Sequence, residues 1–203
     1  MSTAPVALVD AGGANFASVR HALQRLGADV RIARDAGELR GARCIVLPGV
    51  GAAAPAMALL RDRGFDAALP VAEVPLLGIC LGMQLLFEHC EEGDVAALGL
   101  LPGRVEALPA GPRARIPHVG WNTVWPTRPS PLFLDMVPGE AMYFVHGFGV
   151  VDGNAAQVAR SVHGGAFAAA VQQGHVFGVQ FHPERSANAG ARLLANFLQV
   201  SAP

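Results

Sequence analysis

Short apolar runs alternate with amphipathic segments along the first ninety residues of the chain. Apolar runs of four or five residues predict buried strands over 6–9, 30–33, 44–47 and 75–79. Apolar side chains at helical spacing predict helices over 15–26, 52–63 and 81–90. Strands that alternate with helices in this way are typical of a mostly parallel sheet covered by helices.

The pattern changes after residue 104. Strand-like segments follow one another and are joined by turns rich in proline and glycine, over 104–108, 119–125, 141–151, 157–162 and 166–171. These segments predict antiparallel strands. A last apolar strand, 177–181, returns to the sheet, and a helix over 188–200 closes the chain.

Together the two patterns predict an α/β fold. We expect a mainly parallel central sheet with helices on both faces and a small antiparallel extension. No internal repeat, low-complexity segment or linker divides the chain, so we predict one domain over 1–203.

Composition supports one folded domain and excludes several classes of protein. The chain has 203 residues, and a domain of that length buries roughly 70% of its unfolded surface. Hydrophobic residues make up 52% and charged residues 15%, which argues against disorder. The formal net charge of −1 leaves no electrostatic footprint for nucleic acid.

Membrane association and export are not expected either. No stretch of 18 consecutive apolar residues is present, so we predict no membrane-spanning helix. The first residues lack the basic and apolar regions of a signal peptide. Three cysteines, one of them a candidate nucleophile, indicate a reducing compartment, and we expect a cytoplasmic protein.

The main chemical signal is a cysteine at the end of the strand 75–79. Cys80 is bracketed by Gly78 and Gly82, which is the cysteine version of the nucleophile elbow. A Cβ at either glycine would crowd the neighbouring strand and helix. N–H groups of the helix that begins at Leu81 would favour the thiolate. We predict that Cys80 is an acyl-transfer nucleophile; the alternative is a buried structural thiol.

A candidate proton carrier follows the last strand. His182-Pro183-Glu184 comes directly after the apolar run 176–181. A nucleophilic cysteine needs a histidine to carry its proton, and the histidine needs a group that orients it. His182 and Glu184 are two positions apart, so on an extended segment they share a side. A parallel sheet would bring both strand ends to one edge, which predicts a triad of Cys80, His182 and Glu184.

These segments carry a family resemblance. Residues 78–84 (GICLGMQ) and 178–184 (GVQFHPE) resemble the class I (triad) glutamine amidotransferases. Residues 47–51 (LPGVG), 117–122 (PHVGWN) and 143–146 (YFVH) are similar, within that family, to the glutaminase subunits of imidazole glycerol phosphate synthases. The similarity covers about 6–198, nearly the whole chain.

The resemblance implies a reaction and a partner. L-Glutamine would be hydrolysed to glutamate and ammonia without a metal or an organic cofactor. The ammonia would pass to a separate cyclase subunit with a (βα)₈ barrel, in a heterodimer that makes imidazole glycerol phosphate and aminoimidazole carboxamide ribotide for histidine biosynthesis. No spacing of His, Cys and Asp in the chain is typical of a metal site.

Several backbone groups are expected to hold the substrate. Segment 48–51 follows a strand that should lie beside the nucleophile strand, so N–H groups of Val50, Gly51 and Leu81 could face an oxyanion. The alternative is an ordinary turn. The resemblance assigns the glutamine carboxylate to backbone at Gly147 and Phe148. The family usually has Ser-Tyr at these two positions, so the side-chain contacts differ here.

Two further residues are expected to contact glutamine. Gln84 lies one helical turn after Cys80 and could bind the amino-acid end of the substrate. Gly49 belongs to the same predicted glutamine site. A surface glutamine on the helix is the alternative interpretation of Gln84.

The resemblance also predicts residues at the partner interface. They are Asn15, Trp121, Asn122, Tyr143 and Arg185. Arg185 stands where the family usually has lysine, which keeps the charge and changes its geometry. Asn15 could instead be a helix N-cap, and Trp121 could be a core residue.

Three other functions remain open from the sequence. The chain could serve another ammonia-using synthase, such as those for anthranilate, pyridoxal phosphate or GMP; segments 48–51 and 120–122 argue for the histidine pathway. It could be a catalytically silent regulatory subunit, against which the intact Cys80, His182 and Glu184 argue. A γ-glutamyl peptidase would turn over peptides without any partner.

Overall fold

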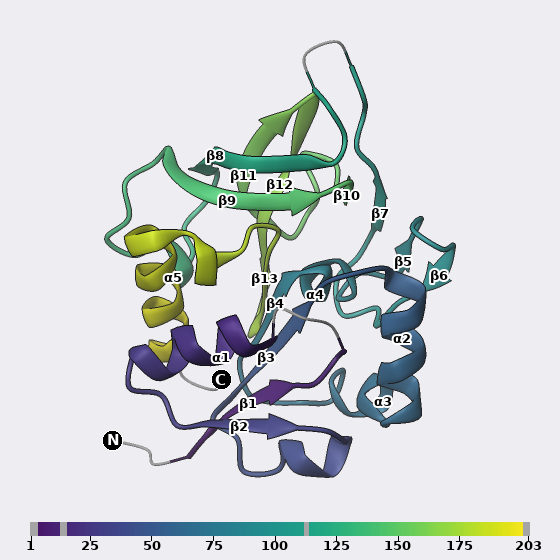
Figure 1. Ribbon diagram of the computed structural model, residues 1–203, viewed down its shortest axis with the longest axis vertical. Helices are drawn as coiled ribbons and strands as arrows, with labels where there is room; N and C mark the ends of the chain where they lie inside the picture. Colours follow the sequence, from purple (N-terminus) through teal and green to yellow (C-terminus); the bar gives the residue numbers. More distant parts are fainter. Residues whose placement is uncertain (1–3, 13–15, 112–113, 201–203) are drawn as a thin grey trace.

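The centre of the molecule is one continuous sheet of nine strands. The structure is a computed structural model, and it describes residues 4–12, 16–111 and 114–200. The nine strands are β1 (Val6–Val9), β2 (Val30–Ala33), β3 (Cys44–Gly49), β4 (Leu76–Cys80), β8 (His118–Pro126), β9 (Glu140–His146), β11 (Gln157–His163), β12 (Gly165–Gln173) and β13 (Val176–Val179). Their order across the sheet is β2-β1-β3-β4-β13-β12-β11-β8-β9 (Figure 1).

Parallel and antiparallel strands occupy different halves of this sheet. Strands β2, β1, β3, β4 and β13 pair in parallel. From β13 onward the pairings through β12, β11, β8 and β9 are antiparallel. The predicted α/β fold is confirmed, and the antiparallel extension is hydrogen-bonded to the parallel half as one sheet. Gly78 of β4 is in register with Gly178 of β13, so the two strands end together at one edge.

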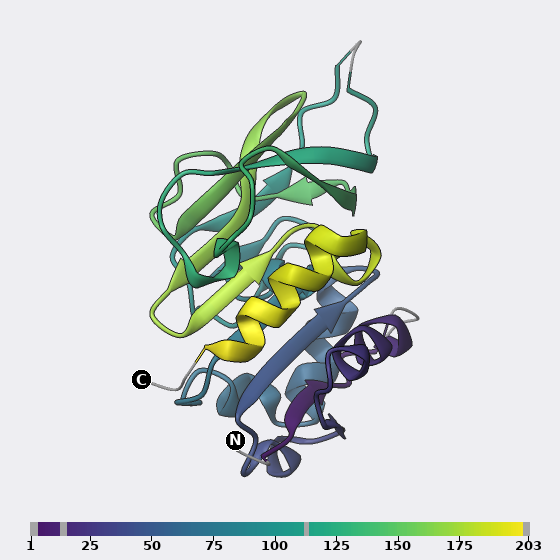
Figure 2. The same ribbon diagram turned by 90° about the vertical axis from the view of Figure 1, so that its left-hand side faces the viewer.

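Helices cover both faces of the parallel half, as predicted (Figures 1 and 2). Helices α1 (Phe16–Arg25) and α5 (Ala187–Gln199) lie on one face, and α2 (Ala53–Asp62) and α3 (Phe65–Ala68) on the other. Alternate residues of each strand point to opposite faces. Val6 and Leu8 therefore join the apolar cluster under α1 and α5, whereas Ala7 and Val9 join the cluster under α2. None of the described helices is long and apolar enough to cross a membrane.

The helix predicted over 81–90 is wrong. Helix α4 spans only Leu81–Gln84, and the chain then turns into β5 (His89–Cys90). Leu85, Leu86 and Phe87 are all fully buried and offer no polar face to solvent. Their carbonyls accept hydrogen bonds from backbone N–H groups within 98–101, which compete with continuation of the helix.

Strand β5 belongs to a second, smaller sheet. Its four strands are β10 (Phe148–Gly149), β7 (Arg104–Ala107), β5 and β6 (Val95–Ala96), in that order. The single strand predicted over 141–151 is therefore divided at Gly147, with β9 in the large sheet and β10 in the small one. Three short 3₁₀ helices complete the described elements, over Ala36–Leu39, Pro131–Phe133 and Pro183–Arg185.

Candidate active site

Cys80 lies at a sharp turn between β4 and α4. Its backbone has φ +54° and ψ −112°, a conformation that residues other than glycine rarely adopt. A Cβ on Gly78 would lie 2.6 Å from the carbonyl oxygen of Gly82, and a Cβ on Gly82 would collide with the carbonyl of Leu47. The two glycines therefore let the turn fold down onto the sheet and hold the sulfur at its edge.

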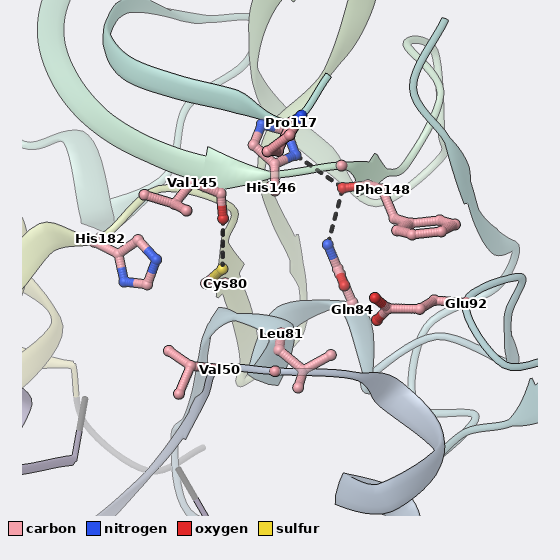
Figure 3. Close-up of a pocket in the computed structure, with 12 residues that line it drawn as sticks. Val50, Cys80, Leu81, Gln84, Glu92, Pro117, Val145, His146, Phe148 and His182 are labelled. Atoms are coloured by element: carbon pink, nitrogen blue, oxygen red, sulfur yellow. Dashed lines mark hydrogen bonds between the residues drawn. The ribbon is translucent and has the colours of Figure 1, made fainter. Parts of the chain in front are cut away.

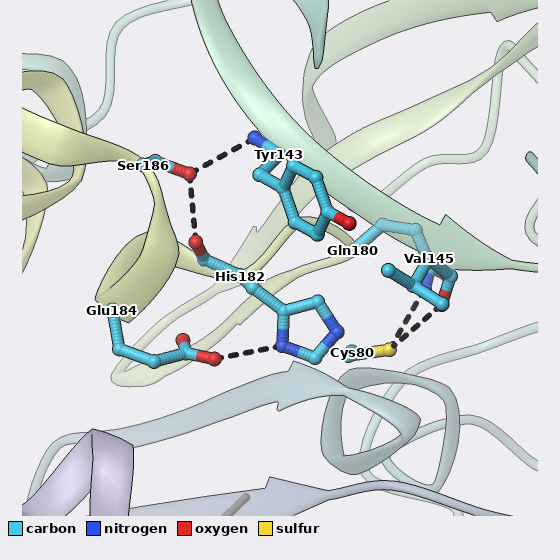
Figure 4. A network of polar contacts seen from close by, with 7 residues as sticks. All are labelled: Cys80, Tyr143, Val145, Gln180, His182, Glu184 and Ser186. Carbon is cyan, nitrogen blue, oxygen red and sulfur yellow. Dashed lines mark hydrogen bonds and ion pairs between the residues drawn. The ribbon is translucent and has the colours of Figure 1, made fainter. Parts of the chain in front are cut away.

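His182 and Glu184 reach the same edge from the neighbouring strand. His182 lies just beyond β13, which pairs in parallel with β4. Its Nδ1 lies 2.8 Å from Oε1 of Glu184, and the side chains are 5% and 0% exposed. The second ring nitrogen faces Cys80 (Figure 4). The structure thus brings together three residues that are up to 104 positions apart in the sequence numbering.

The surroundings of His182 favour its charged form. Burial lowers the pKa of His182, but hydrogen bonds to Cys80 and Glu184 and their negative charges outweigh burial and raise it to about 10. The ring is then an imidazolium at neutral pH. A positive charge beside the sulfur stabilises a thiolate, and the imidazolium holds a proton ready for a leaving group.

A pocket of about 270 Å³ opens beside the sulfur (Figure 3). It is lined by six of the residues predicted around the substrate, namely Val50, Gly51, Leu81, Gln84, Gly147 and Phe148. Gly49, also predicted there, does not line the pocket. It pairs with Cys80 in the sheet, and a Cβ on it would lie 2.8 Å from the N of Gly82, so its place is beneath the elbow.

The turn after β3 has an unusual backbone at the pocket wall. Gly51 has φ +97°, and apart from its chain neighbours no atom in the described part of the chain lies within 4 Å of the position where its Cβ would be. A residue with a side chain would be strained there by its backbone alone. The half-buried Val50 and the exposed Gly51 line the same pocket as Leu81.

Gln84 is buried rather than on a helix surface. Its Nε2 donates to the carbonyl of Phe148 at 2.9 Å and to Oε1 of Gln180 at 3.0 Å. Both N–H groups of this nitrogen are therefore hydrogen-bonded within the protein. The side-chain oxygen accepts no hydrogen bond from the described residues and is the atom left for a ligand.

Besides Pro117 and His146, which also line the pocket, three groups at the site were not predicted. Glu92 lines the pocket, and its Oε2 accepts from the backbone N of Ala53 at the start of α2. Gln180 is fully buried and directs its Nε2 at Sγ of Cys80, 3.8 Å away. The carbonyl of Val145 lies 3.7 Å from the same sulfur. Gln180 and Val145 had a signal in the sequence, since they stand inside the family-like segments 178–184 and 143–146, whereas Glu92 lies in none of these segments.

The residues predicted at a partner interface have different environments. Trp121 is 56% exposed, and its ring packs edge-on against the half-buried Tyr143 at 5.9 Å. Arg185 is exposed. Asn122 turns its amide inward, where it donates to the carbonyl of Val162 at 2.9 Å. Asn15 lies outside the described residues.

Exposed apolar side chains lie on β8 and β9, and one of them, Val145, lines the pocket. Val119 and Trp121 on β8 and Val145 on β9 are 57%, 56% and 38% exposed. In the part of the chain that the structure describes, no group of three or more His, Cys, Asp and Glu side chains could hold a metal ion.

Comparison with known proteins gives a consistent result. The model of the family "Glutamine amidotransferase class-I" matches residues 7–200. The chain is 57% identical over 197 residues to imidazole glycerol phosphate synthase subunit HisH of Xylella fastidiosa, covering 97% of this chain and 98% of the relative. It is 55% identical over 198 residues to the same subunit of Xanthomonas euvesicatoria, covering 98% of each chain.

Solved structures with low sequence identity share the fold. A crystal structure of a glutamine amidotransferase superposes with a TM-score of 0.75 at 22% identity, covering 96% of this chain and 97% of the other. PurLQS from Thermotoga maritima superposes with a TM-score of 0.72 at 24% identity, covering 96% and 98%.

Proposed function

The chain belongs to the class-I glutamine amidotransferase family, and from this premise we propose that it is the glutaminase subunit of an imidazole glycerol phosphate synthase. It hydrolyses L-glutamine and supplies ammonia for histidine biosynthesis. The observation that carries the proposal is the meeting of Cys80, His182 and Glu184 at one edge of the sheet, beside a pocket.

The first step is attack of the Cys80 thiolate on the carboxamide carbon of glutamine. The C–S bond forms, and the carbonyl oxygen becomes an oxyanion. The N–H of Leu81 and N–H groups of the turn at Val50 and Gly51 stabilise that charge, since both segments line the pocket beside the sulfur.

Collapse of this intermediate breaks the C–N bond. His182 gives its proton to the leaving nitrogen, so ammonia departs and a γ-glutamyl thioester remains on Cys80. The hydrogen bond from Nδ1 of His182 to Glu184 keeps the second ring nitrogen directed at the reaction. Glu184 therefore acts by orienting the ring and stabilising its charge.

Hydrolysis of the thioester regenerates the enzyme. The now neutral His182 takes a proton from water, which attacks the thioester carbon and releases glutamate. The proton taken from water makes His182 an imidazolium again, and the C–S bond breaks so that Cys80 leaves as the thiolate. Two acyl transfers replace one direct amide hydrolysis.

The pocket offers acceptors for the amino-acid end of glutamine. The side-chain oxygen of Gln84 and the carboxylate of Glu92 suit its α-ammonium group. Backbone N–H groups at Gly147 and Phe148 suit its carboxylate, which does not need the hydroxyl groups that the family usually has there.

We further propose that the ammonia passes to a separate cyclase chain with a (βα)₈ barrel. Ammonia released into water would be protonated and lost to the synthesis. The described strands form two open sheets and no such barrel. Val145 lines the pocket, and the exposed Val119 and Trp121 lie on the paired strand β8, Val119 directly opposite Val145, so the three suit a partner surface there. We place the complex in the cytoplasm, where its cysteines would stay reduced.

A trapping experiment tests the catalytic proposal. The complex with its cyclase subunit is supplied with glutamine, quenched in acid during turnover and digested for mass spectrometry. We expect glutamate release and a γ-glutamyl adduct on Cys80. A complex that releases no glutamate and carries no adduct would identify the chain as a silent regulatory subunit instead.

A further inference from the structure

Two buried histidines connect the outer strands of the sheet to the wall of the pocket. Nδ1 of His118, on β8, lies 3.0 Å from Nε2 of His146, at the end of β9. Nδ1 of His146 lies 2.8 Å from the carbonyl oxygen of Phe148. At the other end, Nδ2 of Asn122 lies 3.3 Å from Nε2 of His118. The contacts form one uninterrupted chain of hydrogen bonds.

Backbone groups at both ends set the direction of this chain. Asn122 must turn its side-chain nitrogen toward the carbonyl of Val162. Its side-chain oxygen must face the N–H of Thr123, from which it accepts a hydrogen bond at 2.8 Å. Its Nδ2 therefore donates to Nε2 of His118. That ring nitrogen is an acceptor, so the proton of a neutral His118 sits on Nδ1.

The same deduction from the other end gives the same answer. The carbonyl of Phe148 can only accept, so Nδ1 of His146 carries a proton. Nε2 of His146 is then free to accept from Nδ1 of His118. Both rings are neutral and both carry the proton on Nδ1. A second proton on either ring would set two donors against each other.

Beyond Phe148 the chain continues to the nucleophile. The Phe148 carbonyl also accepts from Nε2 of Gln84, as Figure 3 shows, and that nitrogen donates to Oε1 of Gln180 as well. Nε2 of Gln180 is thereby turned toward Sγ of Cys80. In this arrangement the side-chain oxygen of Gln84 faces the pocket, and Nε2 of Gln180 donates toward the sulfur.

Burial supports neutral rings. His118 and His146 are 4% and 6% exposed. Burial lowers the pKa of His118 to about 4 and that of His146 to about 3, with smaller contributions from the neighbouring histidines. The rings keep one charge state and one tautomer over the whole neutral range.

We propose that His118 and His146 are positioning residues of the glutamine site, which fix the Phe148 carbonyl and through it the amide orientation of Gln84. The inference rests on the proposed glutaminase function. The first atom affected, the side-chain oxygen of Gln84, would bind the amino-acid end of glutamine, whereas the donor that faces the sulfur belongs to Gln180, one contact further along. Loss of the chain should therefore raise KM for glutamine more than it lowers kcat.

A purely structural role would look different. The ring of His118 stacks on His163 at 4.1 Å and on Phe144 at 5.0 Å, so it could serve only to fill an aromatic cluster. Under that alternative, His118→Phe would be tolerated and KM would not change.

Matched substitutions separate the two roles. His146→Asn keeps a donor near the place of Nδ1, whereas His146→Gln moves the amide toward the place of Nε2 and loses the donor to Phe148. Likewise His118→Asn keeps a donor toward His146, and His118→Phe keeps only the ring. His175→Gln is the control, since His175 contacts the carbonyl of Ala72 at the opposite end of β13.

Glutamate release is measured in the complex with the cyclase subunit. We expect KM for glutamine to rise about 3- to 10-fold in His146→Gln and His118→Phe, the equivalent of one hydrogen bond, with a smaller change in kcat. In the two asparagine variants and the control, KM for glutamine should stay within about twofold of the wild-type value, because the hydrogen bond is kept. Equal KM values in His146→Asn and His146→Gln would overturn the proposal.

A measurement on the wild-type chain is independent of activity. Long-range ¹H–¹⁵N NMR of histidine-labelled protein at pH 7 reports the protonated nitrogen of each ring. We expect neutral rings protonated at Nδ1 for both His118 and His146; protonation at Nε2, or an imidazolium, would overturn the chain. A wild-type complex that released no glutamate would refute the proposed function and with it the role in glutamine binding, while the tautomers would still show whether the chain of hydrogen bonds exists.

Discussion

The ring of His182 and the carboxylate of Glu184 are joined by a 2.8 Å hydrogen bond between Nδ1 and Oε1. The two residues are separated only by Pro183, at the start of a short 3₁₀ helix. Because Nδ1 is engaged, the other ring nitrogen is directed at Cys80 (Figure 4). The contact therefore decides which nitrogen meets the reacting groups.

Glu184→Gln tests this orienting role. The substitution keeps the shape of the side chain and removes its charge. We expect kcat for glutamate release in the cyclase complex to fall by about 10²- to 10⁴-fold, since an orienting group contributes less than the nucleophile. A loss as complete as that of Cys80→Ala would contradict this ranking.

Two substitutions of the nucleophile separate chemistry from backbone strain. Cys80→Ala and Cys80→Gly should both abolish glutamate release and leave partner binding intact. Because Cys80 has φ +54°, glycine should relieve strain that alanine keeps. We expect the glycine variant to unfold in urea with a free energy about 1 kcal/mol higher than the alanine variant. Glutamate release by Cys80→Ala at a near wild-type rate would refute the elbow assignment.

The close approach of α4 to β3 predicts a large effect at Gly82. A Cβ there would collide with the backbone carbonyl of Leu47, which cannot move without distorting the sheet. Gly82→Ala should lower the free energy of unfolding by about 3 kcal/mol or more, a typical cost of overpacking. Gly111→Ala is the control, because among the described residues, its chain neighbours aside, no atom lies within 4 Å of its Cβ position, and its φ is not positive. Similar urea midpoints for the two variants would be incompatible with this packing.

The turn at Gly51 predicts coupling to the partner. A peptide flanked by glycines has two accessible orientations, and only one aims an N–H at the oxyanion. A missing oxyanion donor costs about 10²- to 10³-fold in rate. We expect the free chain to release glutamate slowly and the cyclase complex with its ligand to be faster by a factor of that order.

Gly51→Pro should remove this difference. Proline lacks an N–H and requires φ near −65°, whereas Gly51 has φ +97°. Glutamate release should be low both in the free variant and in its complex. Equal rates for the wild-type free chain and the wild-type complex would refute the switch and indicate an unregulated glutaminase.

The buried histidine pair predicts a loss of stability in acid. The folded pKa values of His118 and His146 are about 4 and about 3, below the value near 6.5 of an unfolded histidine. Between these limits the unfolded chain binds more protons than the native one, so stability falls as pH falls below about 6.5. His182 has the opposite shift, and its contribution is lost only as pH rises toward about 10.

Urea unfolding at several pH values between 7.5 and 4.5 measures this effect. Each histidine contributes a slope of up to about 1.4 kcal/mol per pH unit. His118→Phe should reduce the slope by about one histidine's share. An unchanged slope in that variant would show that the pair does not control the acid limit.

The sequence predicted the elements that depend on local pattern. Alternating apolar runs identified the parallel strands and their helices, since burial on two faces leaves a short apolar run wherever a strand crosses the core. The bracket of Gly78 and Gly82 around Cys80 predicted the elbow, because the two glycines and the cysteine lie within five residues of one another. The approach of Gly82 to the carbonyl of Leu47 depends instead on the neighbouring strand β3.

Competition between distant segments explains the wrong prediction. The apolar spacing after Leu81 is compatible with a long helix. The structure ends the helix at Gln84 because backbone groups of 98–101 take the carbonyls of Leu85, Leu86 and Phe87. Apolar spacing along one segment does not show which other segment will compete for its hydrogen bonds.

Tertiary structure alone decided how the polar groups around the nucleophile are paired. Gln84 and Gln180 are 96 positions apart, and His118 and His146 are 28 apart. Their contacts depend on strand neighbours, and hydrophobic periodicity shows which face of a strand is buried without showing which strand lies beside it. Asn122 turns inward for the same reason, because the carbonyl of Val162 on neighbouring β11 accepts its N–H. The sequence determined the reactive residues and their local turns; the order of strands in the sheet determined what orients them.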